Sequence, residues 1–143
     1  MSGPTRQKAR IIAFQFLYGS LPEPLPDGPP RAEHAFDKAA FEQFCASFSY
    51  SVDDYSWEVV EGVGKNLPIL DGTISRLSTH WRIERMPRVD LSILRLTAFE
   101  ILFRPDIPKS VAINEAVKLA KAYGEKDSPS FVNGLLDRIA KPS

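Results

Sequence analysis

The 143-residue sequence has very little of the chemistry that most enzymes and metal proteins use. A single cysteine, Cys45, excludes an internal disulfide framework and a thiolate metal cluster, and its apolar neighbours indicate an inert core thiol. The two histidines, His34 and His80, are far apart in the sequence. His80 stands four residues before Glu84, but no third ligand motif accompanies them, so a surface histidine is the favoured interpretation.

Targeting signals and catalytic motifs are also missing. No apolar run approaches the ~20 residues that a membrane span needs, and no small-residue cleavage site follows the basic start "MSGPTRQKAR". The sequence contains no glycine-rich phosphate loop, no serine nucleophile elbow and no kinase signature. These absences predict a cytoplasmic protein in which no residue is assigned a catalytic role.

What the sequence does contain is helical periodicity, with apolar residues at three- and four-residue spacing and no alternating strand pattern. The segment between Pro87 and Pro105 is apolar on nearly all sides, which predicts a central, buried helix. We expect about seven helices and no sheet. The expected helices cover 6–18 with a stop at Gly19, 32–48, a segment capped by Asp53 or Asp54 that reaches Leu67, 68–81, the segment after Pro87, 111–123 capped by Ser110, and a last helix capped by Ser128 with Pro129 in its first turn.

Two short stretches punctuate this pattern. Five prolines in residues 22–30 predict an extended loop, because proline removes backbone donors and restricts the residue before it. Asn133-Gly134 alone would favour a hairpin turn, but the apolar residues around it repeat with helical spacing, so a helix is predicted. Gly134 within that helix suggests close packing against a neighbouring backbone.

Charge is distributed unevenly although the formal net charge is zero. Residues 1–10 contain three basic side chains and no acid, whereas residues 11–75 contain three basic and ten acidic side chains. A basic helix together with aromatic residues near loops is typical of proteins that bind single-stranded RNA, where cations contact phosphates and rings stack on bases. From these residues alone, a plain helical interaction module is the alternative that the pattern favours.

Several segments together resemble one family. "VAINEAVKLAKAYGEKDSPSFVNGLLDRIAK" at 111–141, "VDLSILRLTAFEIL" at 89–102 and "ARIIAFQFLY" at 9–18 are similar to the NusB family of bacterial transcription antitermination factors. "VVEGV" at 59–63 and "LDGTI" at 70–74 also fit, so the resemblance spans the chain in the right order. It implies a single all-α domain over residues 1–143, built from two packed three-helix subdomains, and no cofactor.

The resemblance also implies a function without catalysis. The family binds the boxA element of nascent RNA together with NusE, a small-subunit ribosomal protein. The pair joins the elongating RNA polymerase complex with other Nus factors and suppresses termination, mainly on ribosomal RNA operons. Two alternatives are a helical adaptor that binds protein but no RNA, and a stand-alone relative of the helical domain that precedes an RNA cytosine methyltransferase. Self-association into a homodimer is left open.

Site residues follow from the same resemblance. The RNA-binding candidates are Arg6, Lys8, Arg10, Arg76, Tyr123, Asp127 and Phe131. The first three belong to the basic first helix and are expected to contact phosphate, with Arg76 as an extension of that patch. Phe131 either stacks on a base or anchors the core, and the sequence does not decide between the two. Asp127 is expected to repel phosphate and so to restrain binding.

A second set of residues corresponds to the face that relatives offer to NusE: Tyr18, Glu84 and Asp90. Acidic side chains on that face suit a basic ribosomal partner. Four further polar residues stand within apolar helices, and we expect them to form paired internal contacts because unpaired burial is costly. They are Arg95, Glu100, Asn114 and Glu115.

Overall fold

The computed structural model describes residues 3–20, 22–24 and 32–141, which form seven α-helices, one short 3₁₀ helix and no strand. This result confirms the all-α expectation for the described residues. The elements are α1 (Gly3–Ser20), α2 (Lys38–Ser47), α3 (Asp54–Lys65), α4 (Leu67–Leu77), η1 (Ile83–Arg85), α5 (Arg88–Phe103), α6 (Lys109–Tyr123) and α7 (Ser128–Ala140). Within these residues, no helix is long and apolar enough to cross a membrane.

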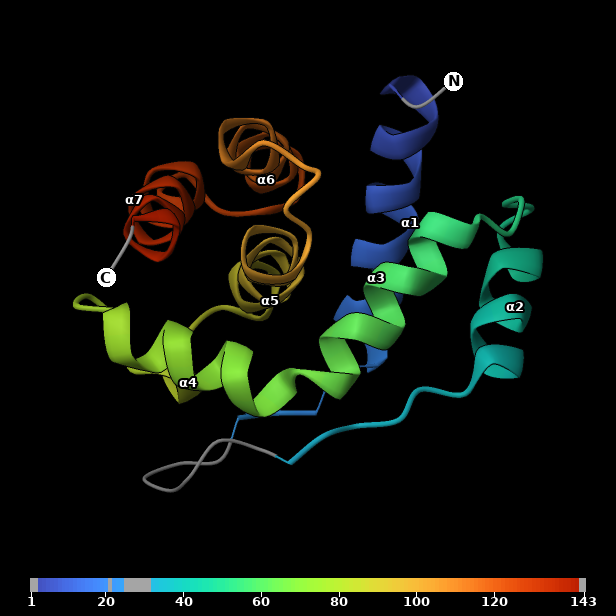
Figure 1. Cartoon of the computed structure of the whole chain (residues 1–143), viewed down its shortest axis with the longest axis horizontal. Helices are drawn as coiled ribbons and strands as arrows, with labels where there is room; N and C mark the ends of the chain where they lie inside the picture. The colour runs from blue at the N-terminus through green and yellow to red at the C-terminus, as the bar shows by residue number, and fades with distance from the viewer. Residues whose placement is uncertain (1–2, 21, 25–31, 142–143) are drawn as a thin grey trace.

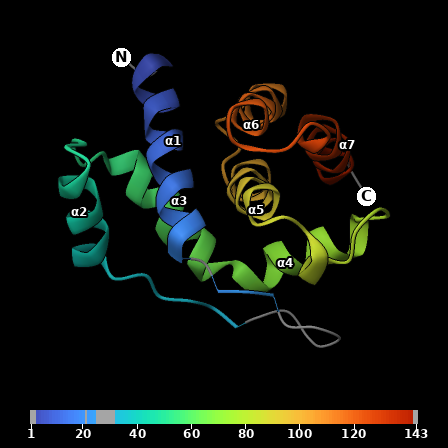
Figure 2. The same cartoon turned by 180° about the vertical axis from the view of Figure 1, so that it is seen from behind.

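The helix α5 stands at the centre, and the other helices are arranged around it in two groups (Figures 1 and 2). α1, α2 and α3 pack together on one side, α6 and α7 pack on the other, and α4 runs across one side of α5 and α7. Residues 90–101 of α5 are all buried, because a helix that is apolar on every side can only be satisfied inside the protein. The predicted central helix is confirmed.

The capping residues mark the first residue of a helix more closely than the apolar periodicity of the sequence does. Asp53 caps α3 as expected, since its side chain accepts from the backbone N–H groups of Tyr55 at 2.8 Å and Ser56 at 3.3 Å. The second helix begins at Lys38 and not at residue 32, because the Asp37 side chain accepts from the Ala39 N–H at 3.1 Å and fixes the first turn there. α1 continues through Gly19 to Ser20, so Gly19 does not stop it.

Three of the later helices, α4, α6 and α7, differ from the expected bounds at their ends. α4 ends at Leu77, where the chain turns into a loop, instead of reaching residue 81. α6 begins at Lys109, directly after Pro108, so Ser110 lies inside its first turn and is not the cap. Ser128 is the first residue of α7 rather than its cap. The helical interpretation of Asn133-Gly134 is confirmed.

Close helix packing occurs at a glycine other than the one expected. A Cβ atom at Gly134 would meet open space, so the predicted tight backbone contact there is wrong. At Gly62 in α3, a Cβ atom would collide with the ring of Phe99 in α5. The missing side chain at Gly62 is therefore what lets α3 approach the central helix. Cys45 is fully buried in α2, as expected, and burial raises the pKa of its thiol.

A buried ion pair ties α4 to α5. The Arg95 guanidinium donates through Nε and Nη2 to the two carboxylate oxygens of Asp71, both at 2.7 Å, and through Nη1 to the Pro22 carbonyl at 3.0 Å. Of the four polar residues expected to pair internally, Arg95 and Glu100 do so, whereas Asn114 is exposed and Glu115 pairs with Lys118 at the surface. The predicted proline loop at 22–30 lies mostly outside the described residues.

Candidate nucleic-acid interface

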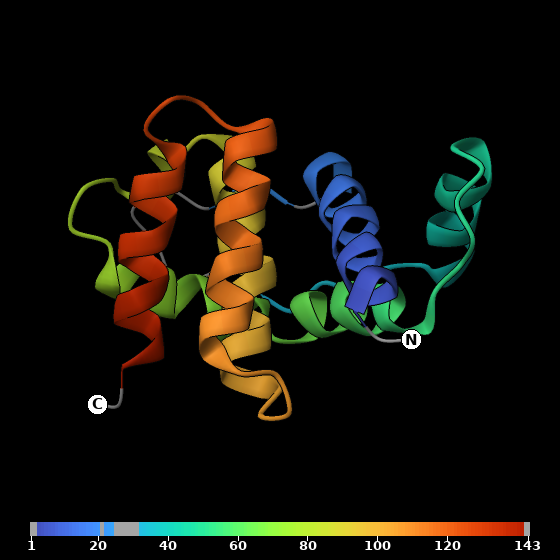
Figure 3. The same ribbon diagram turned by 90° about the horizontal axis from the view of Figure 1, so that it is seen from above.

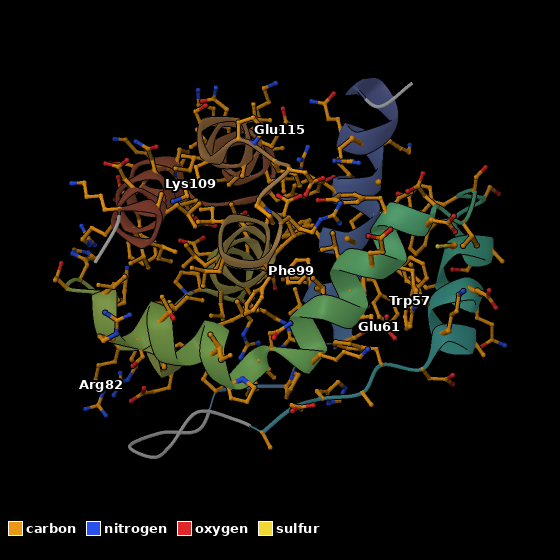
Figure 4. All side chains as sticks on the ribbon, viewed as in Figure 1. Trp57, Glu61, Arg82, Phe99, Lys109 and Glu115 are labelled. Carbon is orange, nitrogen blue, oxygen red and sulfur yellow. The ribbon has the colours of Figure 1, made fainter. Side chains whose placement is uncertain are left out.

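A groove lies between α1 and α6. The two helices point in the same direction (Figure 3). Three adjoining hollows form the groove, from the α5–α6 loop at one end to the last turns of both helices at the other. Glu115, labelled on α6 in Figure 4, lines the two hollows nearer the α5–α6 loop. The main lining residues of this α1–α6 groove are Arg6, Gln7, Arg10, Ile11, Phe14, Gln15, Tyr18, Lys118, Leu119, Ala122 and Tyr123.

The first end of the groove carries basic side chains from α1, but they point in two directions. The Arg6 guanidinium lies 4.0 Å from the centre of the Tyr55 ring and lines the groove. The Lys8 ammonium lies 5.0 Å from the Tyr50 ring and lines a separate hollow beside the α2–α3 loop. Residues two apart on a helix do not share a face, which explains the divergence. The expected basic patch therefore covers two sides of one helix end.

Arg10 borders two of the three hollows, but almost all of its side chain is buried. Its side chain is only 5% exposed, and its Nε donates to both carboxylate oxygens of Glu100, at 3.1 and 2.8 Å. The Tyr55 hydroxyl donates to the same carboxylate, and burial together with the charge of Glu100 raises the pKa of Tyr55. Arg10 is therefore engaged inside the protein through its Nε, and the phosphate contact expected for it stays a prediction.

The other end of the groove is aromatic. Tyr123 is 42% exposed, its ring lies 5.0 Å from that of Phe14, and its hydroxyl accepts from the Gln15 amide at 3.1 Å. Tyr18 lines the same hollow and is equally exposed, with the Arg88 guanidinium 5.5 Å from its ring. The structure thus places Tyr18, expected to bind the partner, next to Tyr123, expected to bind RNA.

The remaining RNA candidates lie away from the groove. Phe131, in the first turn of α7, packs against the core on one side and remains partly exposed, with its ring 6.1 Å from that of His80. Asp127 is exposed just before α7. Arg76 is exposed near the end of α4, on the far side of α5 from the start of α1, so the structure does not join it to the basic patch.

The two acids expected to face a partner differ in accessibility. Glu84 is partly exposed in η1 and pairs with Arg82 at 2.7 Å. Asp90 is only 3% exposed and accepts from the Ser128 hydroxyl at 2.7 Å, and burial raises the pKa of its carboxyl group. Asp90 is therefore part of the interior, and the expectation that it offers a negative charge to a partner is corrected.

Lys118 is a groove residue that the sequence interpretation missed. It projects from α6, lines two of the three hollows and is largely exposed, with its ammonium 3.2 Å from Glu115. Helical spacing places Lys118 and Ala122 on one face, but nothing in the sequence shows that this face borders α1. Among the described side chains, no group of three His, Cys, Asp or Glu residues could hold a metal ion.

Comparison with known proteins gives consistent matches. The model of the NusB family matches residues 7–141. The transcription antitermination protein NusB of Desulfovibrio desulfuricans is 42% identical over 152 residues, covering 96% of this chain and 85% of its own length. The NusB protein of Citrifermentans bemidjiense is 45% identical over 139 residues, covering 95% and 94% of the two chains.

Solved structures agree with these sequence matches. NusB of T. maritima superimposes with a TM-score of 0.70 at 32% identity, covering 94% of this chain and 89% of that one. A structure of the antitermination factors NusB and NusE in complex with dsRNA matches with a TM-score of 0.75 over 96% and 97% of the two chains. The identity in the second case is 23%, so that likeness concerns the fold alone.

Proposed function

Because the chain belongs to the NusB family, we propose that it is a transcription antitermination factor that binds boxA RNA together with NusE. In this proposal the pair joins the elongating RNA polymerase complex with other Nus factors in the cytoplasm, mainly on ribosomal RNA operons. The names of its relatives support the first part, since they are transcription antitermination proteins. A relative of the same fold has been crystallised with NusE and dsRNA, which supports the choice of partners.

The observation that carries the RNA proposal is the α1–α6 groove. Its basic end presents Arg6 and Lys118, and its aromatic end presents Tyr123 and Tyr18. A single strand that follows the groove would place phosphates near the cations and unstacked bases near the rings, which is how single-stranded nucleic acids are held. Lys8 would contact the strand where it passes over the start of α1.

The partner proposal rests on two residues in place of three. Tyr18 and Glu84 are at least partly exposed, so we assign them to the NusE contact and leave out the buried Asp90. Tyr18 closes the aromatic end of the groove. RNA and NusE would therefore meet at this end, and each would complete a surface for the other, which accounts for joint binding.

The test measures binding of a fluorescent boxA RNA by anisotropy, with and without NusE, at two salt concentrations. We expect the mixture with NusE to bind more tightly than either protein, and Arg6→Glu with Lys8→Glu to abolish that gain. Lys65→Glu, a single charge reversal at an exposed site in α3, is the control and should retain the gain. Equal RNA binding by both altered proteins would refute the basic-end assignment. If the protein binds NusE but no RNA binds in any of the mixtures, the protein is a helical adaptor that binds protein alone.

A further inference from the structure

An exposed tryptophan lies in the loop after α4, and hydrogen bonds within the loop hold its backbone in place. Trp81 is 40% exposed. The Ser78 hydroxyl donates to the Trp81 carbonyl at 2.7 Å and accepts from the Trp81 N–H at 3.4 Å, so a single side chain closes this turn. Ile83, two residues later, is buried and anchors the loop in the core. Because the backbone that carries the ring is already held, less conformational entropy is lost when a ligand docks there.

Trp81 is the end of a row of three rings. Its ring centroid lies 5.4 Å from that of His80, and the His80 ring lies 6.1 Å from Phe131 in the first turn of α7. Phe131 is one of the RNA candidates, and only the fold brings it beside a loop that lies about fifty residues earlier in the sequence. The row therefore extends from Phe131, an expected base-stacking residue in α7, to the loop after α4.

The charge around this row suits a polyanion. Residues 76–85 contain three arginines and a single acid, Glu84, which is already paired with Arg82 (Figure 4 labels Arg82 beyond the end of α4). Arg76 and Arg85 are exposed on the same segment. Asp127 adds one exposed negative charge before α7. A nucleotide strand finds here both cations for its phosphates and rings for its bases.

We propose that Trp81, with His80 and Phe131, forms a second stacking surface, which takes an unpaired base of the bound RNA beyond the α1–α6 groove. Arg76 and Arg85 neutralise the adjoining phosphates. This inference rests on the proposed RNA-binding function and enlarges its footprint. It also gives Arg76 a place in the RNA surface, at the α4 end and not beside the first helix.

The two tryptophans of the chain allow a direct test, because Trp57 is half-buried between α3 and α2, with its ring 5.6 Å from that of Phe41. In the Trp57→Phe protein only Trp81 reports by fluorescence. Titration with boxA RNA in the presence of NusE should quench this emission, with the same midpoint as anisotropy. Trp81→Ala should weaken RNA binding about 5- to 100-fold, the range found for loss of one stacked base. Trp81→Phe should retain most of the affinity, and thermal stability should change little in both.

The outcomes separate this inference from the function on which it rests. If RNA binding depends on Arg6 and Lys8 but Trp81 emission and the Trp81→Ala affinity are unchanged, the second surface does not exist and the groove remains. If Trp81 emission changes with NusE alone, and Trp81→Ala weakens only NusE binding, the row is a protein contact and the proposal is overturned. If no RNA binds to the unaltered protein with NusE, the proposed function itself fails.

Discussion

The two buried arginine–carboxylate pairs on either side of α5 have different geometries and hold different parts of the protein. On one side α5 supplies the arginine, and Arg95 donates two parallel hydrogen bonds to the carboxylate of Asp71 in α4. On the other side α5 supplies the carboxylate. Glu100 accepts hydrogen bonds from the Nε of Arg10 in α1 and from the hydroxyl of Tyr55 in α3. The first pair is bidentate and closed, whereas the second is a junction of three helices.

The difference matters because only the junction reaches the candidate interface. The Tyr55 hydroxyl donates a hydrogen bond to Glu100, and the Arg6 guanidinium lies over the Tyr55 ring. The Arg104 guanidinium also lies over this ring, 5.0 Å from its centre. The side chain of Arg6 is thereby placed at the basic end of the groove by a contact whose other end is buried. The Arg95–Asp71 pair instead fixes α4 and the Pro22 carbonyl, away from that end. We therefore expect both pairs to affect stability and only the junction to affect RNA binding.

The largest effect is expected from Asp71→Ala, which leaves the fully buried Arg95 without its carboxylate. Breaking a buried pair on one side lowers the free energy of unfolding by about 3–5 kcal/mol, measurable by chemical denaturation. RNA affinity, measured where both proteins are folded, should not change. Replacing both partners, as Arg95→Met with Asp71→Leu, should recover most of the stability. A weakened RNA affinity in the folded Asp71→Ala protein would contradict the separation of the two pairs.

A smaller loss of stability, together with weaker RNA binding, is expected from Glu100→Gln. Glutamine keeps an acceptor for Arg10 and Tyr55 but removes the negative charge, which weakens charge-assisted hydrogen bonds worth about 1.5–3 kcal/mol each. The buried Arg10 cation is then poorly compensated, which disturbs α1 and with it the position of Arg6 at the basic end of the groove. Denaturation and RNA anisotropy on the same preparation measure the two effects.

An apolar replacement of the junction separates positioning from direct contact. The triple variant Arg10→Met, Glu100→Leu and Tyr55→Phe removes the buried charges but keeps a ring beneath Arg6. It should bind RNA as the unaltered protein does, with the same dependence on salt. If its salt dependence falls by about one phosphate contact while it stays folded, Arg10 touches RNA after all.

The sequence was informative where a pattern depends on a single helix and uninformative where it depends on two. The all-round apolar character of α5 was enough to place it at the centre. By contrast, Arg6 and Arg10 look alike at four-residue spacing, and only the position of Glu100, ninety residues away, shows that Arg10 is buried. The contact of His80 with Phe131 and the place of Lys118 beside α1 have the same cause. The burial of Asp90 likewise depends on how α7 starts, which the sequence of α5 does not show.

Tyr55 allows a finer division within the junction. Tyr55→Phe removes one buried hydrogen bond and should lower the free energy of unfolding by about 1 kcal/mol, with unchanged RNA affinity because the ring under Arg6 remains. Tyr55→Leu removes the ring as well and should weaken RNA binding. Comparing the two variants by anisotropy tests whether the ring or the hydroxyl supports the interface. Equal affinities would show that the Arg6 contact with the ring is irrelevant to RNA.

The smallest effect concerns Asp90, a third acidic group near the start of α5, whose hydrogen bond comes from the Ser128 hydroxyl and not from a guanidinium. Burial, opposed by that hydrogen bond, raises the pKa of Asp90 above its unfolded value, so folding favours the protonated form. Its contribution to stability is present below the unfolded pKa of about 3.9 and is lost as pH rises through the folded pKa. Asp90→Asn should remove this loss, so the stability of the variant relative to the unaltered protein should rise between pH 3 and pH 7. A constant difference across that range would mean that Asp90, like the two paired carboxylates, is compensated by its surroundings.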